Sequence, residues 1–246
     1  MEVCVNSVFS RFENDHKDIF EMYPGLSDTM RISFEVIYDA LDQFGDGLVI
    51  SWNGGKDATV LFHLIRLVCQ WRDPSYPFSS LLAVNFRAEN TFKEVDEFSK
   101  RIAEKYSVEY HDLPIVDSLK NSLRDFVEKN PSKKAFFMGS RRTDPYCDNL
   151  TSFTPCDTNT GWPDIIRVNP ILDWGYHQVW EFLRGFEIEY CTLYDQGFTS
   201  LGSPDKTIPN PELQKDDGSY FPAHKLQDVS TERAGRIYYN SNQTNA

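Results

Sequence analysis

The sequence has few features of a secreted, membrane-spanning or nucleic-acid-binding protein. Its five cysteines form no C-x-x-C pair and are odd in number, which argues against a disulfide framework and offers no zinc-ligand spacing. No apolar run approaches the length of a membrane span, and the N-terminus carries Glu2 and no apolar segment of the signal-peptide kind. With 25 Lys and Arg against 37 Asp and Glu, the net charge of −12 argues against nucleic acid or an anionic membrane as a partner. We therefore expect a cytoplasmic monomer that binds small molecules.

What the sequence does contain is the composition of an ordinary globular protein. Hydrophobic residues make up 40% and charged residues 25% of the 246 residues, a length that favours one large domain over two small ones. Short apolar runs alternate with segments of helical periodicity, which predicts a single α/β domain with a mostly parallel sheet flanked by helices. A loop-rich C-terminal region follows at 190–222. The expected strands are 47–50, 81–86, 108–111, 135–138 and 165–168, and the expected helices are 8–22, 27–44 with Ser27 as its N-cap, 58–71, 92–106, 116–129 and one capped by Asp173.

The heptapeptide at 51–57, Ser-Trp-Asn-Gly-Gly-Lys-Asp, lies between an expected strand and an expected helix. Two adjacent glycines, Gly54 and Gly55, let the backbone bend tightly and leave no side chains between its amides and a ligand. The start of the following helix offers unpaired N–H groups and a positive dipole end to an anion. Lys56 adds a positive charge, and the carboxylate of Asp57 suits a magnesium ion. The stretch predicts a phosphate-binding turn; the alternative is a tight turn with a solvated Lys-Asp pair.

The spacing within this loop excludes two common phosphate-binding motifs. A Walker A loop needs a glycine where the chain has Ile50 and Ser or Thr where it has Asp57, and the Rossmann G-x-G-x-x-G is absent. The pattern Ser-x-x-Gly-Gly-x-Asp instead resembles the pyrophosphate-binding loop of the N-type ATP pyrophosphatases and phosphoadenylyl-sulfate reductase-like proteins. That resemblance implies an adenine nucleotide α-hydrolase-like fold, a modified Rossmann arrangement, and chemistry at the α-phosphate of an adenosine nucleotide.

Polar segments follow three of the expected strands. They are the loop at 51–57, the segment at 85–94 and Ser-Arg-Arg-Thr-Asp-Pro at 140–145. Because ligands of parallel sheets bind beyond the carboxyl ends of the strands, we expect these segments to meet around one crevice.

Four further segments resemble those of one family, the eukaryotic FAD synthetases or FMN adenylyltransferases in their single-domain form. They follow the family's order, together cover about residues 45–240, and leave no room for the molybdopterin-binding-like domain of animal relatives. One departure is Ala58, where relatives usually have cysteine, so a thiol there is not needed for the chemistry. The segments are 140–145; Trp-Pro-Asp-Ile-Ile-Arg at 162–167 with Asn-Pro-Ile-Leu-Asp-Trp at 169–174; Tyr-Cys-Thr-Leu-Tyr-Asp-Gln-Gly-Phe-Thr-Ser-Leu-Gly at 190–202; and Glu-Arg-Ala-Gly-Arg at 232–236.

The resemblance implies a magnesium-dependent nucleotidyltransferase that converts FMN and ATP into FAD and pyrophosphate. Two polyanions must meet in such a site, so it needs cations and Mg²⁺ more than it needs an acid or a base. By resemblance, the catalytic residues are Asn53, Asp57, Asp144, Arg233 and Arg236, and the metal ligands are Asp57 and Asp144. The ATP-binding residues are Ser51, Asn53, Gly54, Gly55, Lys56, Asp57, Asn85, Arg141 and Gly202; the flavin-binding residues are Asp157, Trp162, Asp164, Arg167, Tyr194 and Phe198.

The resemblance also divides the single domain into regions. We expect a helical cover at 1–44, a nucleotide-binding core at 45–145, flavin-binding and C-terminal motifs at 146–240, and a disordered tail at 241–246. Arg233 and Arg236, three residues apart, would share one face of a helix. We expect their segment to fold back over the crevice and reach the phosphates.

Three other functions remain possible on the residues alone. A sulfonucleotide reductase shares the loop but needs a nucleophilic cysteine near its C-terminus, whereas the last cysteine of this chain is Cys191. An amidating ATP pyrophosphatase needs an ammonia source, usually a glutaminase domain. A non-catalytic flavin- or nucleotide-binding module would not need all the residues of the catalytic set.

Overall fold

The sheet is built around a central strand, β1 (Leu48–Ser51), in the computed structural model, which describes residues 5–73 and 78–237. The strand order is β3-β2-β1-β4-β6-β5, and the predicted parallel pairing is confirmed for every neighbour except the edge strand β5, which runs antiparallel to β6. The chain leaves β1 for β2 on one side and reaches β4 on the other, so a crevice is expected at the carboxyl end of β1. The remaining strands are β2 (Leu82–Arg87), β3 (Glu109–Pro114), β4 (Ala135–Phe137), β5 (Phe153–Pro155) and β6 (Ile166–Val168), and the helices are α1 (Val5–Asp15), α2 (Lys17–Met22), α3 (Pro24–Phe44), α4 (Lys56–Arg72), α5 (Lys93–Lys105), α6 (Leu119–Lys129) and α7 (Tyr176–Gly185).

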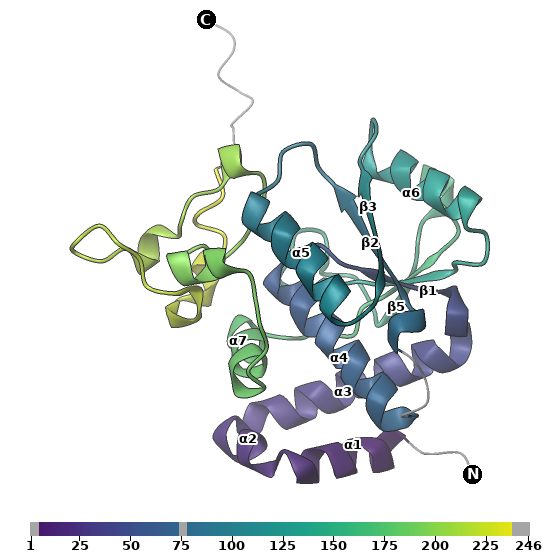
Figure 1. Cartoon of the computed structure of the whole chain (residues 1–246), viewed down its shortest axis with the longest axis horizontal. Helices are drawn as coiled ribbons and strands as arrows, with labels where there is room; N and C mark the ends of the chain where they lie inside the picture. The colour runs from purple at the N-terminus through teal and green to yellow at the C-terminus, as the bar shows by residue number, and fades with distance from the viewer. Residues whose placement is uncertain (1–4, 74–77, 238–246) are drawn as a thin grey trace, which may run out of the picture.

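The two faces of the sheet bury apolar side chains against different sets of helices. Alternate residues of a strand point to opposite faces, so Leu48 and Ile50 join one core while Val49 joins the other. The larger core includes residues of α1, α3, α4, α5 and α7, whereas the smaller one is closed by α6 through Leu123 and Phe126. In Figure 1, α6 stands apart from the other helices, on the right of the sheet. Helices therefore cover both faces, as the alternation of elements predicts.

The N-terminal cover is helical, but its boundaries differ from the expected ones. The helix expected at 8–22 is two helices, with a break at His16, whose ring nitrogen lies 2.8 Å from the carbonyl oxygen of Phe12. The next helix begins at Pro24, because proline is well tolerated in the first turn, where its missing N–H needs no partner. Ser27 is therefore inside α3 and not its cap; its hydroxyl donates a hydrogen bond to Glu13.

Two details of the C-terminal half also differ from expectation. The edge strand β5, three residues long and ending in Pro155, is too short for alternation to reveal it. Helix α7 has Gly175 as its N-cap, and the expected cap Asp173 instead pairs with Arg142 at 2.6 Å. The region at 190–222 contains short 3-10 turns and loops, as expected, while the tail expected at 241–246 lies outside the described residues. Within the described ranges, no helix combines the length and hydrophobicity needed to cross a bilayer.

Candidate active site

The predicted phosphate-binding loop connects β1 directly to α4. Trp52 anchors it: the indole is fully buried, and its Nε1–H donates to the Ser99 carbonyl at 3.0 Å. Gly54 has a φ of +70°, and a Cβ there would lie 2.3 Å from the Ser99 hydroxyl, so both the backbone and the packing require glycine. Gly139, two residues after the end of β4, packs against the first turn of α4, where an added Cβ would lie 3.1 Å from the Ala58 nitrogen. The carboxyl ends of β1 and β4 are thereby held close together.

Two side chains accept hydrogen bonds from the amides at the start of α4. The Gly55 N–H donates to Asn53 Oδ1 at 3.0 Å, and the Lys56 N–H donates to the Tyr194 hydroxyl at 2.8 Å. Tyr194 is buried, and burial, followed by the charge of Asp57, raises the pKa of its phenol, so the group stays protonated. The 190–202 segment is thus tied to the phosphate loop through this phenol.

A cluster of four charges lies beside the loop. Lys56 Nζ is 3.0 Å from Asp57 Oδ2 and 2.6 Å from Glu232 Oε1. Arg141 Nε is 2.8 Å from Asp57 Oδ1, and Arg141 Nη2 donates to both Glu232 oxygens at 2.5 and 2.7 Å. The side chains of Lys56 and Arg141 are only 3% and 1% exposed, so their charges require these carboxylates. We call Lys56, Asp57, Arg141 and Glu232 the charge cluster.

The pKa shifts of the cluster follow from burial opposed by ion pairing. Burial alone would lower the pKa of Arg141, but Asp57 and Glu232 hold it above its ordinary value. Burial would raise the pKa of Glu232, but Lys56 and Arg141 outweigh it, so the pKa is lowered. Arg141 and Glu232 therefore remain charged at neutral pH.

Asp144 joins the charge cluster to the C-terminal motif. Its Oδ2 accepts the backbone N–H of Arg141 at 2.9 Å, and its Oδ1 is 2.8 Å from Arg233 Nη2. The segment at 233–236 is not helical, so the two arginines do not share a helix face. A short antiparallel bridge between Thr207 and Arg236 fixes the segment instead, with Gly235 accepting from the Ile208 N–H at 2.9 Å. Both arginines nonetheless line the same pocket.

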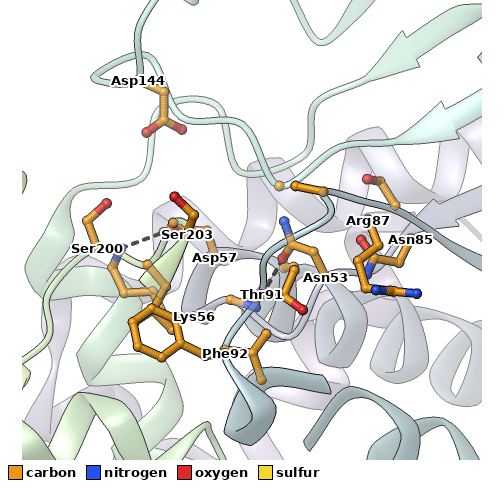
Figure 2. A pocket seen from close by; sticks show the side chains of 18 of the residues that line it. Asn53, Lys56, Asp57, Asn85, Arg87, Thr91, Phe92, Asp144, Ser200 and Ser203 are labelled. Carbon is orange, nitrogen blue, oxygen red and sulfur yellow. Dashed lines mark hydrogen bonds and ion pairs between the residues drawn. The ribbon is translucent and has the colours of Figure 1, made fainter. Parts of the chain in front are cut away.

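The pocket has a volume of about 430 Å³ and lies at the carboxyl ends of β1, β2 and β4. In Figure 2, Asn85 and Arg87 lie at one end of it and Ser200 and Ser203 at the other, with the loop between them. Residues from the segments at 51–58, 85–96, 138–144, 194–203 and 232–236 surround it. The predicted site residues that line it are Ser51, Asn53, Gly55, Lys56, Asp57, Asn85, Asp144, Tyr194, Gly202, Arg233 and Arg236.

The two carboxylates predicted to bind Mg²⁺ face this pocket, but each already contacts cationic side chains. The structure, within its described residues, contains no group of three or more His, Cys, Asp or Glu side chains that could hold a metal ion. Mg²⁺ usually takes one or two carboxylates and completes its shell with water and phosphate oxygens. Asp57 and Asp144 therefore fit a magnesium ion that arrives with a phosphate ligand, and do not fit a closed protein cage.

The sequence and structure were compared with known proteins. A family model described as "Phosphoadenosine phosphosulfate reductase domain" matches residues 47–124 and 110–209. A probable FAD synthase of Schizosaccharomyces pombe is 35% identical over 225 residues, which cover 90% of this chain and 83% of that protein. The chain belongs to the FAD synthase family.

Two further relatives agree with this assignment. A probable FAD synthase of Caenorhabditis elegans is 40% identical over 195 residues; the match covers 77% of this chain but 36% of that longer protein. The structure of Candida glabrata FMN adenylyltransferase in complex with FMN and the ATP analogue AMPCPP is 26% identical, with a TM-score of 0.80 over 87% of this chain and 90% of that one. The chain therefore shares both the sequence pattern and the fold of the FAD synthase family.

Four of the predicted flavin-binding residues of this FAD synthase family member lie away from the pocket, around β5 and β6. Asp157 is exposed and caps the 3-10 turn Thr158–Thr160 by accepting from the Asn159 N–H at 3.0 Å. Trp162 packs on the smaller core, with Lys120 Nζ 5.5 Å from its ring centroid. Asp164 is exposed, and Arg167 in β6 has a buried Nε without a hydrogen-bond partner among the described residues. Their role in flavin binding stays a prediction.

The remaining predicted residues support the pocket from outside it. Phe198 packs edge to face on Phe92 at 5.5 Å, Gly54 shapes the loop, and Arg141 lies buried in the charge cluster. Gly202 does line the pocket, but its main constraint is Arg236: a Cβ at Gly202 would lie 1.6 Å from Arg236 Nη1.

Sequence reasoning missed three charged residues that line the pocket: Arg87, Asp96 and Glu232. Arg87 lines the pocket and pairs with Asp112 at 3.0 Å. The sequence does contain a pattern that indicates Arg87: it follows Asn85 by two positions in β2, and side chains two apart in a strand share one face of the sheet. Glu232 belongs to a recognised motif, but nothing in the motif indicates that its carboxylate reaches Lys56, 176 residues earlier.

Proposed function

We propose that this chain is an FMN adenylyltransferase that transfers AMP from ATP to FMN, giving FAD and pyrophosphate. The observation that carries the proposal is a single pocket in which the phosphate loop, the charge cluster and both arginines of the C-terminal motif meet. The Candida glabrata relative with this fold binds FMN and an ATP analogue. Cys191 supports the choice over a sulfonucleotide reductase, since the thiol is buried and burial raises its pKa.

In the proposed reaction an oxygen of the FMN phosphate forms a bond to the α-phosphorus of ATP. The bond from that phosphorus to the oxygen bridging to the β-phosphorus breaks, and pyrophosphate leaves with the electron pair. In this proposal the β- and γ-phosphates are bound by the Lys56 ammonium and by the amides of the first turn of α4 that do not donate to Asn53 or Tyr194. Arg233 and Arg236 reach the charge that grows on the leaving pyrophosphate. Magnesium, when bound with the nucleotide, adds further positive charge near Asp57 and Asp144.

The proposed reaction assigns one substrate to each of the two main regions of the domain. In this proposal, residues 45–145 hold ATP, and the motifs of 146–240 supply the flavin side through Asp157, Trp162, Asp164, Arg167, Tyr194 and Phe198. The protein works as a cytoplasmic monomer that binds no nucleic acid.

The proposal is tested by incubating the protein with FMN, ATP and MgCl₂ and separating the products by chromatography. We expect FAD and pyrophosphate in equal amounts, and no product when EDTA removes the metal. A parallel reaction with phosphoadenylyl sulfate and a thiol reductant is expected to release no sulfite. Tight binding of FMN and ATP without FAD would show a non-catalytic module and contradict the proposal.

Replacing Gly202 by alanine is expected to lower kcat/KM about tenfold, because the added Cβ displaces the Arg236 guanidinium from the pocket. A double-mutant cycle measures this coupling: Gly202→Ala should cost little once Arg236→Ala is already present. Gly25→Ala is the matched control, since an added Cβ there has no neighbour within 4 Å. Fully additive losses would show that Gly202 acts independently of Arg236.

A further inference from the structure

Glu232 places a negative charge in the wall of a pocket that binds polyphosphate in the proposed function. Its carboxylate lines the pocket and is 12% exposed, with Lys56 and Arg141 within 2.7 Å. A carboxylate in such a position repels phosphate oxygens through the low-dielectric protein. The contribution of Glu232 to the site is therefore not that of a phosphate ligand.

The backbone around Glu232 is held as firmly as its side chain. The Thr199 hydroxyl donates to the Glu232 carbonyl at 2.6 Å, and the Asn210 amide donates to the Thr231 carbonyl at 2.9 Å. Thr199 and Asn210 are both buried and hydrogen-bond each other at 3.0 Å. Glu232 is thus held through both its backbone and its carboxylate, so the position of its charge in the pocket wall is fixed by the fold.

The charge cluster and the neighbouring pair of Arg233 and Asp144 each balance positive with negative charge. Lys56 and Arg141 are matched by Asp57 and Glu232, and Arg233 is matched by Asp144. Without Glu232, the charge cluster would carry one uncompensated positive charge next to the phosphate loop. That charge would attract polyphosphate in the substrate and in the product alike, and tight binding of a product slows its release.

We propose, on the basis of the adenylyltransferase function above, that Glu232 is an internal counter-anion that lowers the affinity of the site for pyrophosphate. It holds Lys56 and Arg141 in place, and it prevents these buried cations from retaining the released product. Glu232 is in this view a positioning residue, since it acts on the phosphates through Lys56 and Arg141.

The test is calorimetric titration of the full chain with inorganic pyrophosphate and magnesium, in the absence of FMN and ATP. Glu232→Gln keeps the shape of the side chain and is expected to bind pyrophosphate about tenfold more tightly than the natural protein. In kinetics with ATP and FMN, KM for ATP and the inhibition constant of pyrophosphate should both fall. Glu212→Gln, which removes the same charge from an exposed position, should leave the affinity unchanged.

Glu232→Asp keeps the negative charge, but its shorter side chain moves that charge away from Lys56 and Arg141. Its affinity for pyrophosphate should therefore fall between those of the natural protein and Glu232→Gln. Equal or weaker binding by folded Glu232→Gln overturns the inference. If Glu232→Gln does not fold, Glu232→Asp is the deciding variant. An affinity of Glu232→Asp for pyrophosphate equal to that of the natural protein then overturns the inference. Because the titration needs no turnover, a chain that makes no FAD refutes the proposed function separately.

Discussion

Asp57→Asn is expected to reduce the rate of AMP transfer by on the order of a thousandfold. The Asp57 carboxylate faces the pocket, contacts Arg141 at 2.8 Å and Lys56 at 3.0 Å, and is the predicted magnesium ligand that belongs to the phosphate loop. Asparagine preserves the shape of the side chain but removes the charge that organises both cations and the metal. Single-turnover kinetics with quenched mixtures of ATP and FMN would measure the effect on the chemical step.

The stability of this variant has to be measured together with its rate. Both Asp57→Asn and Asp57→Ala break the buried ion pair with Arg141, a loss of about 3–5 kcal/mol, but asparagine keeps an oxygen that accepts a hydrogen bond from Arg141. Alanine also removes that acceptor, so its effect on folding would be harder to separate from its effect on catalysis. Thermal melting should show that Asp57→Asn remains folded at the assay temperature. Asp18→Asn on the exposed side of α2 is the matched control. Near-natural turnover by a folded Asp57→Asn protein would remove Asp57 from the catalytic set.

Arg233→Ala is expected to lower kcat by on the order of a hundredfold, with a smaller change in the KM for ATP. Arg233 lines the pocket that the phosphate loop also lines, and its guanidinium pairs with Asp144 at 2.8 Å. Arginine suits this position because its planar fork binds phosphate oxygens in pairs. Arg236→Ala should act in the same direction, and more mildly.

The structure also predicts that Arg233→Ala loses activity without losing folding stability. The pair with Asp144 is partly exposed, at 34% and 21%, so its loss should cost less than about 1 kcal/mol of folding stability. The melting temperature should therefore change little while kcat falls. Arg124→Ala on the exposed face of α6 is the control. A large fall in melting temperature with unchanged kcat would assign Arg233 a structural role.

The local patterns in the sequence determine the sheet and the loop on which the site is built. Hydrophobic periodicity predicts each parallel strand and the helices that follow β1, β2, β3 and β6, because the side chains of one element must bury together whatever the rest of the chain does. The glycines and charged residues of 51–57 predict a phosphate loop for the same reason, since its chemistry depends on backbone groups that are close in sequence. The motifs further along the chain indicate the family, and with it the residues to look for.

Tertiary structure alone decides which of these residues meet. The hydrogen bond from the Lys56 N–H to Tyr194 joins residues 138 apart, and the ion pair of Lys56 with Glu232 joins residues 176 apart. No periodicity encodes such contacts, because their energy comes from partners brought together by the packing of the whole chain. Burial also changes what a residue can do: Arg141 is predicted from the sequence to bind ATP, but in the fold its side chain is enclosed between Asp57 and Glu232. The charge balance of the pocket follows from that enclosure, and therefore only from the folded chain.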